Sequence, residues 1–98
     1  MTKPPLRRCA VVNNPNGLHL RPATRFAQQA RVLPQRVTVF HGEKRADGKS
    51  SLDLLMLIAM PGAELWVELD GPDADTSPDA AEAIRALCDI LAAPGDDA

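Results

Sequence analysis

The spacing of hydrophobic side chains predicts short elements that alternate between strand and helix. Residues 8–13 are typical of a strand, which the turn-forming run Asn-Asn-Pro-Asn-Gly ends. Alanines and Phe26 then recur at helical spacing, and Pro22 suits a first helical turn because it needs no backbone N–H there. This pattern predicts a helix over residues 21–32.

The middle of the chain predicts a hairpin and a short helix. Residues 36–40 alternate between polar and apolar side chains, and residues 44–46 form a second, polar strand after a turn. The sequence Ser-Ser-Leu-Asp at 50–53 matches the capping box that begins many helices, and the apolar run after it lacks strand alternation. A second helix is therefore expected over residues 51–59.

A strand and a long helix complete the order. Residues 63–70 alternate, with three apolar residues on one face and Trp66 among carboxylates on the other. Ser77 precedes a proline and caps a helix predicted over residues 78–92. The order β-α-β-β-α-β-α predicts an α+β fold, a four-stranded and mainly antiparallel sheet with three helices on one face. No repeat or linker interrupts residues 1–98, which we expect to form one domain.

Composition excludes several classes of function. The 98 residues suit one modest core with no deep substrate cavity, and 45% hydrophobic with 24% charged residues is ordinary for a globular domain. The longest apolar run, 54–60, is far short of the roughly 20 residues that cross a bilayer, and no signal-type stretch opens the chain. We expect a cytoplasmic protein without membrane contact. Three aromatic residues and no Lys/Arg-rich run argue against nucleic acid as a partner.

Charge is divided unequally between the two halves. Residues 1–49 carry ten basic and two acidic side chains, whereas residues 50–98 carry one and eleven. Such segregation steers association with charged partners if it survives folding. The alternative is that folding interleaves the two halves and cancels the difference.

The sequence gives little support for a metal site. Cys9 and Cys88 have neither the CxxC spacing nor a neighbouring histidine cluster, so both are interpreted as ordinary buried thiols. His41 adjoins Gly42 and Glu43 and is interpreted as a solvated residue of the hairpin turn.

The most informative segment places an imidazole at the start of the first predicted helix. The N–H groups and positive dipole end of a helix favour a phosphate on His19, and Arg21 supplies forked donors for its oxygens. A histidine at a helix start can equally be a simple cap or surface residue. Asn16 is a candidate to orient the His19 ring, although an asparagine before glycine is explained as well by the turn.

Two motifs resemble one known family. Residues 17–23 read GLHLRPA and match the active-site loop G-[LIM]-H-x-R-P-A of HPr, the histidine-containing phosphocarrier of the bacterial phosphotransferase system. A lysine-serine pair, Lys49 and Ser50, stands before the second predicted helix at an interval similar to the family's. The resemblance covers roughly residues 7–92 and implies an HPr-like open-faced sandwich.

The resemblance implies a phosphocarrier rather than a stand-alone enzyme. Phosphorylated enzyme I, charged from phosphoenolpyruvate, would phosphorylate His19, which would pass the group to a histidine of a IIA-type acceptor. Leu20 and Arg21 would bind the phosphate, and neither a metal nor an organic cofactor is needed. The protein is expected to act as a monomer. Whether it serves sugar uptake or nitrogen regulation is left open.

An apolar docking surface is expected beside His19. A helix over 51–59 cannot bury every side of its apolar run, although the alternative is that residues 52–56 are all core. Ser51 stands where the family usually has a large aliphatic residue. The expected partner-binding residues are Leu20, Arg25, Lys49, Ser51, Leu52, Leu55 and Met56.

Ser50 has two interpretations. The plain one is a helix N-cap, and the other is a regulatory phosphosite for a serine kinase and phosphorylase, as the resemblance implies for part of the family. Helix amides would favour phosphate there, whereas the Asp53 carboxylate would repel it. The alternative function is accordingly a regulatory binding module of the same fold that acts through Ser50.

Overall fold

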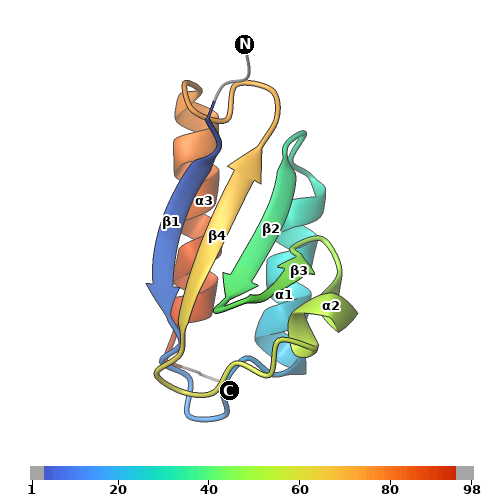
Figure 1. Cartoon of the computed structure of the whole chain (residues 1–98), viewed down its shortest axis with the longest axis vertical. Helices are drawn as coiled ribbons and strands as arrows, with labels where there is room; N and C mark the ends of the chain where they lie inside the picture. The colour runs from blue at the N-terminus through green and yellow to red at the C-terminus, as the bar shows by residue number, and fades with distance from the viewer. Residues whose placement is uncertain (1–3, 95–98) are drawn as a thin grey trace.

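A four-stranded antiparallel sheet forms the centre of the fold, and three helices lie behind it in Figure 1. This computed structural model describes residues 4–94. The sheet order is β1 (Leu6–Val11), β4 (Glu64–Asp70), β2 (Arg36–His41) and β3 (Lys44–Asp47). The helices are α1 (Leu20–Arg31), α2 (Ser51–Leu55) and α3 (Pro78–Ala92). The predicted α+β class and element order are confirmed.

The core lies between the helices and one face of the sheet. Strand alternation turns Leu65, Val67 and Leu69 of β4 inward, and each is fully buried. α1 contributes Phe26 and three alanines to the same core, and each of these four residues is fully buried. Because burying one large apolar side chain contributes about 1.5–3 kcal/mol, this layer is what holds the helices against the sheet.

The other face of the sheet carries no helix. Trp66 is 45% exposed there, beside its strand partner Phe40. The Arg7 guanidinium lies 5.1 Å from the centre of the Phe40 ring, and its Nε donates to Glu68 at 2.8 Å. Trp66 therefore covers an exposed sheet surface, which the sequence left undecided.

Cys9 also lies on the outer face, so the prediction that both thiols are buried is wrong for this residue. Ala10 and Val12 turn inward, and the period of two then turns Cys9 outward, opposite Trp66. Cys88 is buried as predicted, and burial raises the pKa of its thiol to about 11.

The second helix is shorter than predicted. It ends at Leu55 instead of residue 59, and Ile58 takes the left-handed conformation with φ +51°. The Ala59 carbonyl beyond it accepts a hydrogen bond from the Leu18 N–H at 2.9 Å, so this backbone joins another loop instead of continuing the helix. A β-branched residue in this conformation is strained, by roughly 1–2 kcal/mol.

The remaining boundaries agree with the prediction to within two residues. α3 has the predicted bounds because two signals mark its start, the Ser77 cap and Pro78 in the first turn. The Ser77 Oγ accepts hydrogen bonds from the Asp79 and Ala80 N–H groups at 3.1 and 3.4 Å. Within residues 4–94, no helix has the length and apolar character needed to cross a membrane.

His41 is not a solvated turn residue. The hairpin turn consists of Gly42 and Glu43, so His41 is the last residue of β2 and pairs with Lys44. Its Nδ1 lies 3.1 Å from the Leu57 carbonyl, which can only accept, so Nδ1 donates. This histidine is half-buried and holds the strand to the segment after α2.

Folding interleaves the basic and acidic halves within the sheet. The acidic strand β4 lies between β1 and β2, which carry arginines. Arg7 forms an ion pair with Glu68, and Arg36 is the register partner of Asp70. The charge difference between the halves is therefore largely cancelled across the sheet.

We expect the two thiols to react at very different rates. In the native protein at pH 8, Ellman's reagent should titrate Cys9 within minutes, whereas Cys88 should react after denaturant is added, because it is buried and its thiolate fraction is small. Cys9→Ser should remove the fast reaction. Two fast thiols in the native protein would contradict the burial of Cys88.

Candidate functional site

His19 is the N-cap residue of α1, with φ −101° and ψ −171°. Its carbonyl accepts from the Ala23 N–H at 3.1 Å, and its side chain makes no capping hydrogen bond. The ring is therefore not used to satisfy the helix end. This leaves it for a contact with the preceding loop and for chemistry.

Close packing of the loop fixes where His19 lies. Gly17 has φ +70°, and a Cβ atom there would lie 2.6 Å from the Ala59 carbonyl oxygen. Any side chain at this position would push the loop away from the segment after α2. Leu18 is buried beside it, so His19 starts α1 from an anchored backbone.

Asn14, which the sequence analysis did not single out, contacts the His19 ring. Its Nδ2 lies 3.2 Å from His19 Nε2, and its Oδ1 accepts from the Asn16 N–H at 2.8 Å. The second bond is the side-chain turn that an asparagine forms with the residue two positions on. The sequence contains this turn signal at Asn14. The residue named from the sequence as a candidate to orient the ring was Asn16, which is exposed to solvent.

The open side of His19 is a hollow of about 710 Å³, and among residues 4–94 its lining includes two arginines and no carboxylate. The first turn of α1 contains no acidic residue. Helix dipole and guanidinium groups therefore act in the same direction and favour an anion beside His19. The lining residues are Asn16, His19, Leu20, Arg21, Thr24, Arg25 and Gln28.

Part of the expected docking surface is exposed. Leu20, Leu52 and Met56 are 61%, 74% and 73% exposed, and we call these three residues the docking patch. Leu55 differs, because it is half-buried and packs against the core. Sequence reasoning missed Ile58 and Met60, which are exposed in the irregular segment after α2.

Lys49 lies apart from the arginines at His19. Its Nζ donates to the Leu33 carbonyl at 2.7 Å, just beyond the end of α1, while Arg31 Nε donates to the Lys49 carbonyl at 2.9 Å. These two bonds tie the loop before α2 to the end of α1. Of the two basic residues expected to bind partners, Arg25 lines the His19 hollow and Lys49 does not.

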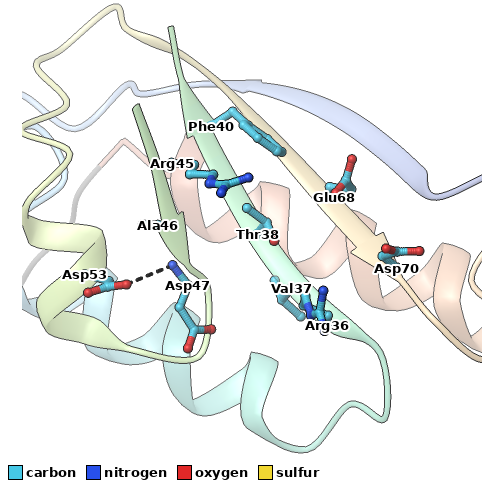
Figure 2. Close-up of a pocket in the computed structure, with 10 residues that line it drawn as sticks. All are labelled: Arg36, Val37, Thr38, Phe40, Arg45, Ala46, Asp47, Asp53, Glu68 and Asp70. Carbon is cyan, nitrogen blue, oxygen red and sulfur yellow. Dashed lines mark hydrogen bonds between the residues drawn. The ribbon is translucent and has the colours of Figure 1, made fainter. Parts of the chain in front are cut away.

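Ser50 is the N-cap of α2, as its plain interpretation predicted. Its Oγ accepts from the Asp53 N–H at 3.2 Å. The Asp53 carboxylate in turn accepts from the Asp47 N–H at 3.1 Å, the bond drawn in Figure 2. The capping box is half complete, because the Ser50 N–H donates to the Asp47 carbonyl instead of to Asp53. Ser51, the first residue of this helix, is half-buried.

A second hollow lies on the outer face of the sheet and shares no residue with the His19 site. Figure 2 shows Phe40, Arg45 and Asp47 along its strands, with Asp53 entering from α2. It encloses about 580 Å³ and has two arginines and four carboxylates in its lining. No group of three or more potential metal ligands occurs within residues 4–94. The site with a nucleophilic ring in an anion-favouring environment is the one at His19.

The chain is similar to known phosphocarriers in sequence and in fold. A family model described as "PTS HPr component phosphorylation site" matches residues 6–93. The phosphocarrier protein NPr of Shewanella violacea is 37% identical over 98 residues, which are 100% of this chain and 99% of that protein. The phosphocarrier protein HPr of Neisseria meningitidis is 36% identical over 86 residues, 88% of this chain and 90% of that protein.

The structural likeness extends over the same length. The histidine-containing phosphocarrier protein of Mycoplasma matches with a TM-score of 0.78 at 28% identity, over 90% of this chain and 99% of that one. The open-faced sandwich predicted from the two motifs is thereby confirmed.

The Ser50 cap makes a testable contribution to stability. Ser50→Ala should lower the free energy of unfolding by about 1 kcal/mol, because the Asp53 N–H loses its acceptor. Urea denaturation followed by circular dichroism measures the change. Ser51→Ala is the matched control and should stay within about 0.5 kcal/mol of the parent. Equal losses for the two variants would show that the cap is not a stabilising interaction.

Proposed function

Because the chain belongs to the HPr family of phosphotransferase-system phosphocarriers, we propose that His19 accepts a phosphoryl group from phosphorylated enzyme I and passes it to a histidine of a IIA-type acceptor. The observation that carries the proposal is the environment of His19, an imidazole at a helix start whose hollow is lined by two arginines and, among the residues that the structure describes, by no carboxylate. The reaction belongs in the cytoplasm, and the protein acts as a monomer.

The transfer exchanges one P–N bond for another. The P–N bond of the donor histidine breaks with its electron pair on the donor nitrogen, and a P–N bond forms at His19. Asn14 contacts Nε2, so Nδ1 is the ring nitrogen that takes the phosphoryl group. The attack uses the Nδ1 lone pair, so the ring proton is on Nε2 at that stage; the His19 ring then loses this proton and the donor ring gains one. Neither a metal nor an organic cofactor takes part.

The start of α1 stabilises the transferred group. The Leu20 and Arg21 backbone N–H groups lie in the first helical turn, and the Arg21 guanidinium adds paired donors for phosphate oxygens. The same groups oppose a positive charge and favour a negative one. They hold the phosphoryl group during its transfer between two partners.

Partner recognition takes place at the docking patch. Exposed apolar side chains next to a cationic hollow suit a partner with an apolar contact surface and carboxylates at its rim. Arg25 supplies charge, whereas Leu55 and Ser51 support the patch from half-buried positions. Met56 adapts its shape to more than one partner, as a carrier with a donor and an acceptor requires.

The regulatory alternative through Ser50 has less support. The Ser50 hydroxyl already accepts the cap hydrogen bond, and the Asp47 and Asp53 carboxylates are close by in the same network. A phosphate on Ser50 would be repelled by both. A serine kinase would act against this repulsion, whereas a phosphorylase that removes the phosphate would be assisted by it.

His19 should carry the label. Incubation with phosphoenolpyruvate and enzyme I should add one phosphoryl group that is stable in alkali and lost in acid, because N-protonation breaks the P–N bond. His19→Ala should abolish the labelling, as measured by intact-protein mass spectrometry. His41→Ala, the matched control, should leave it unchanged. Labelling of the His19→Ala protein would refute the proposal.

Docking should depend on Leu52. Leu52→Glu places a carboxylate in the docking patch and should raise the KM of enzyme I for this protein at least about tenfold by opposing an acidic partner. Val32→Glu is the matched control, because Val32 is 79% exposed at the other end of α1 from His19. Equal KM values for the two variants, with unchanged circular dichroism spectra, would remove Leu52 from the interface.

A further inference from the structure

Ile58, in the segment after α2, has a conformation that the packing of the fold does not explain. Its φ of +51° lies in the left-handed region, where a β-branched residue is rare. Within residues 4–94 the only other non-glycine residue there is Asp73, a residue type that tolerates this backbone. The Ile58 side chain is 65% exposed, so burial in the core does not compensate for the strain. An exposed and strained residue of this kind points to a function of its side chain.

Hydrogen bonds hold the backbone immediately before and after Ile58. The Leu57 carbonyl accepts from His41 Nδ1 at 3.1 Å. On the other side, the Ala59 carbonyl accepts from the Leu18 N–H at 2.9 Å. The Ile58 side chain is therefore presented from an anchored backbone, and the second bond fixes that backbone relative to the start of α1.

Exposed apolar side chains are concentrated on this part of the molecule. Within residues 4–94, eight large hydrophobic side chains are exposed, and five of them belong to the start of α1 or to residues 52–60. These five are Leu20, Leu52, Met56, Ile58 and Met60. A Cβ atom at Gly17 would lie 3.4 Å from the Met60 Cα, so the segment after α2 lies against the loop before α1. Ile58 therefore continues the docking patch along that segment.

The charge of the neighbouring hollow indicates which partner meets this surface. Arg21 and Arg25 line the His19 hollow, and no carboxylate of the described residues does. Such a hollow attracts an anionic group, and the phosphohistidine of a phosphorylated donor is anionic. The acceptor instead meets the protein after His19 has gained a phosphate, which partly neutralises the positive field. The unphosphorylated protein therefore suits the donor.

We propose that Ile58 is a specificity-determining contact for phosphorylated enzyme I, and that its strained backbone holds an apolar side chain in place for this partner. The proposal rests on the function proposed above, which names enzyme I as the donor. Docking buries the Ile58 side chain and gains hydrophobic free energy that is absent in the free protein. Because the backbone is anchored before docking, little conformational entropy is lost on binding.

Stability and docking should respond to Ile58→Gly in opposite directions. Glycine relieves the left-handed backbone and should raise the Tm by about 4 °C. It also removes the side chain and should raise the KM of enzyme I for this protein about five- to tenfold. The kcat should stay within about twofold of the parent, because the lost contact serves binding alone. A purely structural role would instead give a lower Tm and an unchanged KM.

Two further variants separate the backbone strain from the side-chain contact. Asparagine tolerates the left-handed conformation but is polar, so Ile58→Asn should raise the KM as Ile58→Gly does. Leucine keeps the apolar area, so Ile58→Leu should stay within about twofold of the parent KM. Val32→Ala is the matched control, because it removes an exposed apolar side chain at the other end of α1 and should leave the KM unchanged.

Direct binding distinguishes a failure of this proposal from a failure of the proposed function. Isothermal titration calorimetry with purified enzyme I measures the Kd of the parent and the variants without any phosphoryl transfer. Equal Kd and KM values for the parent, Ile58→Gly and Ile58→Asn would overturn the role of Ile58, as would a loss confined to transfer to the acceptor. A parent that binds enzyme I without becoming phosphorylated would refute the proposed function, whereas weaker binding of Ile58→Gly would still support the contact.

Discussion

The hydrogen bond from the Leu18 N–H to the Ala59 carbonyl joins the loop that carries His19 to the segment that follows α2. Gly17 makes this bond possible, since a Cβ atom there would collide with the same carbonyl. The start of α1 and the end of α2 are consequently held in one fixed relation. Because His19 and the docking patch belong to these two helices, their positions relative to each other are fixed by this bond.

The balance of positive and negative side chains differs between the sheet and the start of α1. Across the sheet, β4 brings carboxylates between arginine-bearing strands, and the charges of the two halves of the chain largely cancel. At the start of α1 they do not cancel, because no acidic side chain of the described part of the chain lies in the first helical turn or in the lining of the His19 hollow. The positive field is therefore concentrated beside His19, and the protein as a whole keeps a net charge near zero.

Local signals in the sequence were sufficient to predict an element where residues within or next to that element determine its boundary and its buried face. The Ser77 cap and Pro78 gave the start of α3 to the residue, and the strict alternation of residues 63–70 identified the buried face of β4. The predictions were wrong where contacts between residues far apart in the sequence determine the end of an element. The apolar run after Ser50 is compatible with a longer helix, and the bond from Leu18 to Ala59, which no local pattern reveals, prevents it.

The candidate site was predictable to a similar degree. The loop motif pointed to His19 and Arg21, but the contact between Asn14 and the ring depends on how the turn folds back. Cys9 was assigned to the wrong face because its strand is too short to show a clear alternation. Lys49 was expected among the partner-binding residues, whereas its ammonium group donates to the Leu33 carbonyl just beyond the end of α1.

The left-handed backbone of Ile58, in the exposed segment after α2, lowers the stability of the fold. Glycine would relieve the left-handed backbone at this position, and the gain of about 1 kcal/mol would be a considerable fraction of the stability of so small a protein. Isoleucine instead extends the apolar surface next to Met56 with a side chain that is 65% exposed. A search for thermostable variants would therefore select glycine here and, in doing so, would reduce the exposed apolar surface next to Met56.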